Sequence, residues 1–290
     1  MMNDLIKLMR PHQYVKNLFV LAPIFFAGAI LQENALINGL IAFVLFSITA
    51  SAIYVLNDLK DIQEDRAHPT KCNRPIASGR ISITQAWLLF IGLASIGLLG
   101  SFWLSEVLFY IVTTYILLNI FYSLGLKHVS ILDISIISFG FVLRVLAGAA
   151  VIETPPSMWI ILITFLLALF LALAKRRDDV LLSTQGLKTR KNIDGYNLEF
   201  VNAAMVIMSS VVIVAYIFYT ISDTVQARLG TDYLYLTVIF VIVGIMRYMQ
   251  ITFVENDSGS PTKVVLKDKF LKITIGLWAL AFGLIIYTNG

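Results

Sequence analysis

Nine stretches of the chain are long enough and apolar enough to cross a lipid bilayer. A spanning helix needs roughly 17–25 mostly apolar residues, and 58% of this chain is hydrophobic while 14% is charged. The first stretch is the shortest and contains Pro23. We therefore expect an all-α, polytopic membrane protein in which residues 1–290 form a single domain. The nine expected spans cover residues 17–31, 35–56, 86–104, 107–124, 131–151, 158–174, 202–222, 232–250 and 271–288.

Lys and Arg gather at one end of the expected spans. Twenty of the 22 lie on the same side, in the N-terminal segment and in loops or span ends, whereas the loops of the opposite side carry only Arg228. Cytoplasmic loops retain Lys and Arg, so we expect the N-terminus and the large polar loops in the cytoplasm and Gly290 outside the cell membrane. The amphipathic N-terminal segment is typical of an interfacial helix and not of a cleaved signal. Nothing in this pattern favours nucleic-acid binding.

The loop after the second expected span opens with a group of polar and acidic residues. Asn57, Asp58, Asp61 and Asp65 follow N-D-x-x-D-x-x-x-D spacing, which places all four side chains on one face of a continuing helix. Carboxylates held this close repel one another, and a divalent cation removes the conflict. Oxygen ligands favour Mg²⁺, which often completes its shell with substrate phosphates. The motif predicts a magnesium site formed by the three aspartates with Asn57 beside them, although an isolated acidic pair can also be a solvated helix end.

Basic residues accompany this motif. Lys71 and Arg74 follow it in the same loop, and the sixth expected span ends in the run "KRRDD" at 175–179. Cations beside a metal site indicate a polyphosphate ligand. Each of them could equally be a topological anchor.

The segment "NDLKDIQEDRAHPTKCNRPIASGRIS" resembles the first aspartate-rich motif of the UbiA superfamily of intramembrane prenyltransferases, and the nine-span plan is similar to that family over nearly the whole chain. The resemblance implies a bundle with a central cavity beneath cytoplasmic polar loops, and aspartates that hold Mg²⁺ bound to a diphosphate. The family carries a second aspartate-rich motif after its sixth span. At that place this chain has the basic run 175–177 before Asp178 and Asp179.

That departure, together with "RPHQYVKN" at 10–17 and "GFVLRVLAGAAV" at 140–151, is similar to the branch of decaprenyl-phosphate phosphoribosyltransferases. The resemblance implies a Mg²⁺-dependent pentosyltransferase that moves 5-phosphoribose from phosphoribosyl diphosphate to a polyprenyl phosphate of decaprenyl type, for cell-envelope glycan synthesis. It also makes a homotrimer a candidate assembly. We expect catalytic roles for Asn57, Asp58, Asp61 and Asp65. The candidate substrate-binding residues are Lys16, Asn17, Lys71, Arg74, Lys175, Arg176, Arg177, Asp178 and Tyr196.

Two other functions stay open from the residues. A prenyltransferase acting on an aromatic acceptor would need a stronger second acidic cluster. A transporter would carry ionisable residues along a path through several spans, and only Arg144 lies deep in an expected span. A charge at that depth is expensive, so Arg144 either pairs with another helix or serves function directly.

Overall fold

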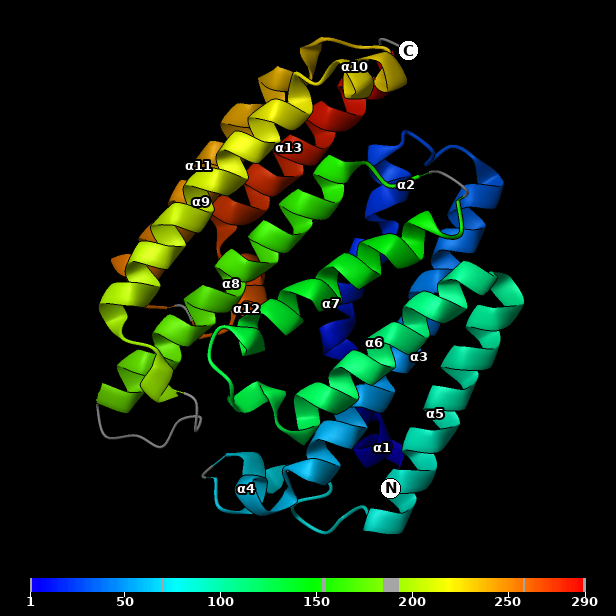
Figure 1. Ribbon diagram of the computed structural model, residues 1–290, viewed down its shortest axis with the longest axis vertical. Coiled ribbons are helices and arrows are strands. Elements are labelled where there is room, and N and C mark those ends of the chain that lie inside the picture. Colours follow the sequence, from blue (N-terminus) through cyan, green and yellow to red (C-terminus); the bar gives the residue numbers. More distant parts are fainter. Residues whose placement is uncertain (1, 69, 153–154, 185–192, 258, 289–290) are drawn as a thin grey trace. The chain divides into compact units, whose positions relative to one another are not determined.

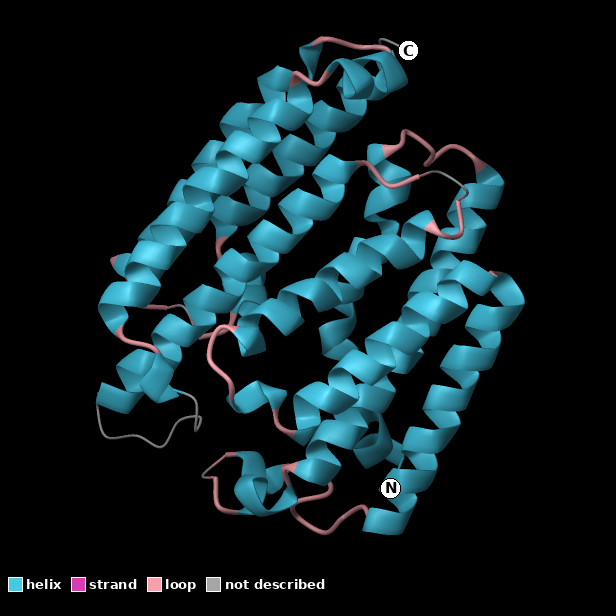
Figure 2. Ribbon diagram, in the orientation of Figure 1, coloured by secondary structure: helices cyan, strands magenta, loops and turns pink. Residues whose placement is uncertain are grey.

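The computed structural model describes residues 2–68, 70–152, 155–184, 193–257 and 259–288, and within these ranges the chain forms helices, turns and loops but no strand (Figures 1 and 2). Three of the basic residues expected after the sixth span, Lys188, Arg190 and Lys191, lie outside the described residues. The helical prediction is confirmed.

The longer elements are α3 (Glu33–Lys60), α5 (Ile83–Leu104), α6 (Glu106–Leu124), α7 (Leu132–Ala149), α8 (Met158–Thr184), α9 (Leu198–Thr220), α11 (Val238–Phe253) and α13 (Lys269–Thr288). The short α-helices are α1 (Met2–Met9), α2 (Ala22–Phe26), α4 (Ile62–Arg66), α10 (Asp223–Leu229) and α12 (Pro261–Lys267). The 3₁₀ helices are η1 (Pro11–Leu21), η2 (Lys71–Asn73), η3 (Leu126–His128), η4 (Ile193–Gly195) and η5 (Tyr233–Thr237).

Within the described residues, eight helices are long and apolar enough to cross a membrane, the seventh of them formed by η5 and α11 together. They match the second to ninth expected spans. The first expected span, 17–31, differs because the chain there forms η1 and the five-residue α2 instead of one long α-helix. Pro23 lacks the N–H that would continue a helix through this point, and Gly28 ends the segment with a left-handed φ of 69°.

Contacts divide the chain into two compact units, which we describe separately. Unit 1 comprises Met1–Phe25, Ala29–Leu126 and Leu143–Pro156, and unit 2 comprises Phe26–Gly28, Lys127–Val142 and Ser157–Gly290. The single domain over 1–290 stays a prediction.

In unit 1, α3 packs against α5 and α6 (Figure 1). Glycines of α5 allow the close approach: a Cβ on Gly97 would lie 2.2 Å from Oγ1 of Thr49, and one on Gly100 would lie 2.4 Å from a methyl of Leu45. Small residues at helix contacts are the usual means of tight packing in membranes. The result is a largely buried α3, whose polar end is held in a defined position by its neighbours.

In unit 2, α8 packs against α9, and α11 packs against both α9 and α13. The core of this unit includes Phe170, Met205 and Tyr248. The side chain of Asn197 caps α9 by accepting a hydrogen bond from the Phe200 amide at 2.7 Å, a standard way of satisfying a free N–H at a helix start. These contacts fix the polar end of α8, which carries the charged run at 175–179.

Candidate active site

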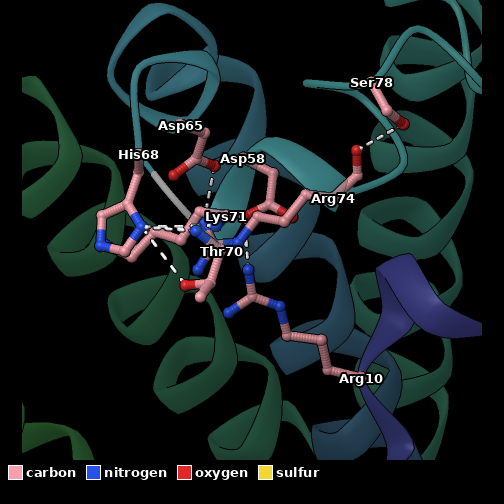
Figure 3. Close-up of polar contacts among 8 residues, drawn as sticks. All are labelled: Arg10, Asp58, Asp65, His68, Thr70, Lys71, Arg74 and Ser78. Atoms are coloured by element: carbon pink, nitrogen blue, oxygen red, sulfur yellow. Dashed lines mark hydrogen bonds and ion pairs between the residues drawn. The ribbon is translucent and has the colours of Figure 1, made fainter.

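Two buried carboxylates of the acidic motif share one guanidinium. Asp58 and Asp65 are each only 3% exposed. One nitrogen of Arg74 donates to Oδ1 of Asp58 at 3.0 Å and to Oδ2 of Asp65 at 2.7 Å, and Arg10 donates a further short hydrogen bond to Oδ1 of Asp58 (Figure 3). Two carboxylates and two guanidiniums therefore form a compact, charge-balanced cluster at the end of α3.

The other two residues of the motif are placed differently from the expectation of one continuous helical face. Asp61 lies between α3 and α4 with φ −96° and ψ 13°, so the helix is interrupted in the middle of the motif. Its side chain is half-buried. Asn57 accepts a short hydrogen bond from the hydroxyl of Ser123 on α6, which fixes its amide oxygen against a neighbouring helix.

The donor set at this end of α3 fits a magnesium ion chemically, because carboxylate oxygens are the ligands that Mg²⁺ prefers. The geometry brings together Asp58 and Asp65, two of the three predicted ligands. Over the described ranges, no three His, Cys, Asp or Glu side chains gather as a group that could hold a metal. Asp61 therefore has to approach the other two before all three can share one ion.

The loop that follows the motif is ordered by its own contacts. Nδ1 of His68 accepts from the amide of Thr70 at 3.2 Å, and Lys71 lies exposed on the turn that follows (Figure 3). Arg80 donates to Asp4 of α1 at 3.0 Å. Arg74 of this loop donates to both buried carboxylates of the acidic motif.

Asn17 is 2% exposed and lies inside unit 1. It donates to Ser47 Oγ at 3.0 Å and accepts from Nε of Arg144 at 2.8 Å. Arg144 also donates to the hydroxyl of Tyr115 at 3.2 Å, so it pairs with other elements of the bundle. Lys16, one position before Asn17, is half-buried on η1.

In unit 2, Arg176 belongs to an internal ion-pair network. It is 1% exposed, and its Nε donates to Oδ2 of the fully buried Asp133 at 2.7 Å, while NH1 bonds to Asp179. The Tyr196 hydroxyl donates to Oδ1 of Asp133 at 2.6 Å and accepts from the amide of Ile131 at 2.6 Å. Burial, followed by the hydrogen bond to Asp133, raises the pKa of Tyr196 above its usual range.

Arg177 is also held by protein groups. Its guanidinium donates to Asn202 at 3.0 Å, to the Thr252 carbonyl at 2.7 Å and to Asn256 at 3.0 Å, and it lies 5.2 Å from the ring centroid of Phe253. A guanidinium satisfied in this way links α8 to α9 and to the end of α11. Phosphate binding by Arg176 or Arg177 would require these contacts to rearrange.

Lys175 and Asp178, the remaining candidates of this run, are both half-buried. The backbone of Gly259 passes so close to Asp178 that a Cβ there would lie 2.5 Å from its Oδ2. Lys175 is therefore the basic residue of the run whose side chain is partly exposed, since Arg176 and Arg177 are buried.

From the sequence, Arg10 enters only as the first residue of the segment 10–17 and is assigned no role at the site. It lies in "MRPH", outside the acidic loop, and has left-handed backbone angles of φ 55° and ψ 57°. Non-glycine residues seldom adopt this conformation. A basic residue directly before Pro11, at the junction of an amphipathic helix and a span, is the one local signal that could have drawn attention to it.

The described helices and the two buried carboxylates at the polar end of apolar α3 define the class of polytopic helical membrane proteins. A model of the UbiA prenyltransferase family matches residues 20–273. The chain belongs to the UbiA prenyltransferase family.

Relatives and solved structures agree with this assignment. The chain is 34% identical to a decaprenyl-phosphate phosphoribosyltransferase of Mycolicibacterium smegmatis, over 99% of this chain and 93% of that protein. It is 31% identical to the protein of the same name from Corynebacterium glutamicum, over 98% of this chain and 87% of the relative. A UbiA homolog from Archaeoglobus fulgidus, solved with DMAPP and Mg²⁺, has the same fold, with a TM-score of 0.72 and 18% identity over 98% of this chain and 99% of that one.

Proposed function

We propose that the protein transfers 5-phosphoribose from phosphoribosyl diphosphate to a polyprenyl phosphate of decaprenyl type. The observation that carries the choice of substrates is the near full-length similarity to the two decaprenyl-phosphate phosphoribosyltransferases. The buried pair Asp58 and Asp65 supports the proposal chemically, because its oxygens suit the magnesium ion that accompanies a diphosphate leaving group.

The residues of the motif have distinct roles in this proposal. Asp58, Asp61 and Asp65 would hold Mg²⁺, and Asn57 would support them through its contact with Ser123. The bound ion would offset the charge that develops on the departing diphosphate. Arg74 and Lys71 would bind the donor phosphates by charge-assisted hydrogen bonds.

The reaction breaks the bond between the anomeric carbon and the diphosphate oxygen, and the diphosphate leaves with the electron pair. A phosphate oxygen of the lipid forms the new bond to that carbon. A lipid phosphate is already an anion near neutral pH, so no side chain has to remove a proton from it. Lys16, Lys175, Arg176 and Arg177 remain phosphate-binding candidates, and Asn17 remains a substrate-binding candidate. Asn17, Arg176 and Arg177 would combine this role with the structural contacts that they make. Asp178 and Tyr196 also remain substrate-binding candidates.

We further infer nine crossings, with the N-terminus and the acidic motif in the cytoplasm. The eleven residues of η1 rise about 2.0 Å each and the five of α2 about 1.5 Å each. Together they span about 30 Å, the thickness of a bilayer core.

The family match at 20–273 runs through both compact units, which supports one functional domain over 1–290. A homotrimer is the proposed assembly.

Radiolabelled phosphoribosyl diphosphate and a polyprenyl phosphate test the proposal directly. Purified protein should move the label into the organic phase when Mg²⁺ is present and should not do so when the metal is chelated. A protein that ignores phosphoribosyl diphosphate and alkylates an aromatic acid with a prenyl diphosphate would instead be a conventional member of the family.

A further inference from the structure

One face of α3 is lined by residues that contact the N-terminal segment. The positions are spaced by four, three and four residues, which places them on one side of the helix. They are Ser47, Ser51, Tyr54 and Asp58. We call these four positions and their partners in residues 9–17 the polar ladder.

The ladder fixes the register of the N-terminal segment along α3. At one end Asn17 donates to Ser47 at 3.0 Å. In the middle, the hydroxyl of Ser51 lies 2.8 Å from that of Tyr14 and donates to the Met9 carbonyl at 3.0 Å. Because the carbonyl of Met9 is held, the backbone entering Arg10 is held too.

At the other end of the ladder the side chain of Arg10 reaches the acidic motif. Its guanidinium lies 5.2 Å from the ring centroid of Tyr54 and bonds to Asp58. Arg74 approaches the same carboxylate from the following loop and also holds Asp65. Two cations thus neutralise two carboxylates that are nearly inaccessible to water.

A divalent cation that binds Asp58 and Asp65 must come close to both guanidiniums. Like charges at such short distances repel strongly beside carboxylates that water hardly reaches, and breaking the arginine contacts without a substitute forfeits their charge-assisted hydrogen bonds. A diphosphate removes both penalties, because its oxygens accept from the displaced guanidiniums and its negative charge balances the metal.

On these grounds we propose that Arg10 and Arg74 make metal binding conditional on diphosphate binding, by occupying the carboxylate oxygens of Asp58 and Asp65 until a diphosphate accepts their hydrogen bonds. The inference rests on the proposed function, in which this motif binds Mg²⁺ and a diphosphate. It adds a thermodynamic coupling between the two ligands. Bound diphosphate raises the affinity for the metal, and bound metal raises the affinity for diphosphate by the same factor.

Calorimetric titration of Mn²⁺ into the purified full chain, with and without inorganic pyrophosphate, measures this coupling without any turnover. For the wild type we expect Mn²⁺ alone to bind weakly and pyrophosphate to tighten it by roughly 10- to 150-fold, the usual range of such couplings. In Arg74→Gln, Mn²⁺ alone should bind at least about tenfold more tightly than in the wild type, because the two charge-assisted hydrogen bonds of Arg74 to Asp58 and Asp65 no longer compete with the metal. The tightening by pyrophosphate should shrink.

Arg80→Gln is the matched control, because Arg80 belongs to the same loop but pairs with Asp4; its coupling should equal that of the wild type. Arg10→Gln tests the same inference independently if Arg74→Gln does not fold. Unchanged or weaker binding of Mn²⁺ alone in a folded Arg74→Gln or Arg10→Gln protein, with the wild-type coupling retained, overturns the conditional role of the arginines while leaving the metal site intact. A wild-type protein that binds no Mn²⁺ even with pyrophosphate overturns the metal–diphosphate assignment itself, and the inference with it.

Discussion

Nε of Arg144 donates a hydrogen bond to Oδ1 of Asn17 at 2.8 Å, joining two buried residues that stand 127 positions apart in the chain. Both belong to unit 1, and Arg144 also lies 5.2 Å from the ring centroids of Phe46 and Tyr115. The contact ties η1 to α7. A Cβ on Gly148, one helical turn further along α7, would lie 1.8 Å from the Val20 carbonyl, so the two elements also approach closely through their backbones.

Arg144→Met should lower stability because it leaves the amide of Asn17 and the hydroxyl of Tyr115 without this donor. Each buried polar group that loses its partner costs about 1–3 kcal/mol. A double-mutant cycle with Asn17→Ala, followed by thermal unfolding in detergent, should give a coupling energy of about 0.5–3 kcal/mol. Additive effects of the two substitutions would show that the contact contributes nothing.

Asp58→Asn and Asp61→Asn should each reduce phosphoribosyl transfer by about 100-fold or more, which corresponds to about 2.7 kcal/mol of transition-state stabilisation. Both remove the negative charge of a proposed metal ligand. Asp58→Asn should also lower stability, since Asp58 is buried against two arginines, whereas the half-buried Asp61 should be replaced with little loss. Transfer rates and melting temperatures measure both effects, and Glu64→Gln, at an exposed position, is the control. A wild-type transfer rate in either aspartate variant would show that the residue is not a metal ligand.

Lys175→Gln and Arg176→Gln should separate binding from folding. Lys175 is partly exposed, so its replacement should raise the apparent KM for one phosphorylated substrate by roughly tenfold, as expected for one charge-assisted contact. Arg176→Gln should instead destabilise unit 2 by about 3–5 kcal/mol, because it leaves buried Asp133 without its ionic partner. Steady-state kinetics and thermal unfolding distinguish the two; a normal KM for both substrates in Lys175→Gln would make that residue a topological anchor.

Alkaline pH should weaken the contact between Tyr196 and Asp133. Tyrosine in an unfolded chain ionises near pH 10, whereas burial and the hydrogen bond to Asp133 raise the pKa of folded Tyr196. The stability that Tyr196 contributes is therefore fully present below about pH 10 and is lost as the pH rises through its raised pKa. Melting temperatures should fall less steeply above this pH in Tyr196→Phe than in the wild type. Equal slopes in the two proteins would contradict the linkage.

The single cysteine reports the orientation. Cys72 follows the acidic motif, is half-buried and makes no disulfide. A membrane-impermeant thiol reagent should miss it in intact cells and label it after permeabilisation. In a Cys72→Ser background, Asp232→Cys, at an exposed position beside α10 that the proposed topology places outside, should give the opposite pattern. Labelling of Cys72 from outside would reverse the proposed topology.

Eight spans and the acidic motif could be predicted from the sequence because both depend on short-range regularities, namely apolar length and the spacing of like residues. The interruption of the helix at Asp61, between α3 and α4, could not be predicted in this way. A helical-wheel argument assumes that the helix continues, and the turn between α3 and α4 depends on tertiary contacts such as the one between Arg74 and Asp65.

The partners of the arginines could not be predicted from the sequence either. Arg176 and Arg177 stand beside two aspartates and suggest a ligand. Of this local pair, Asp179 bonds to Arg176, and the other partners come from Asp133, Asn202 and the end of α11. Arg10 is separated from the acidic motif by 48 residues, so nothing in its own segment marks it as a partner of Asp58. Which cation meets which carboxylate is set by packing between elements far apart in the chain.

The polar ladder and the contact between Asn17 and Arg144 also constrain the order in which the protein can mature. Asn17 is synthesised 127 residues before Arg144, a delay of roughly 6–25 s at about 5–20 residues per second. During this interval α3 already offers Ser47 and Ser51, but the donor from α7 does not yet exist. The N-terminal segment is therefore the first part of the chain to be made, yet its contact with α7 can form only after about half of the chain has been synthesised.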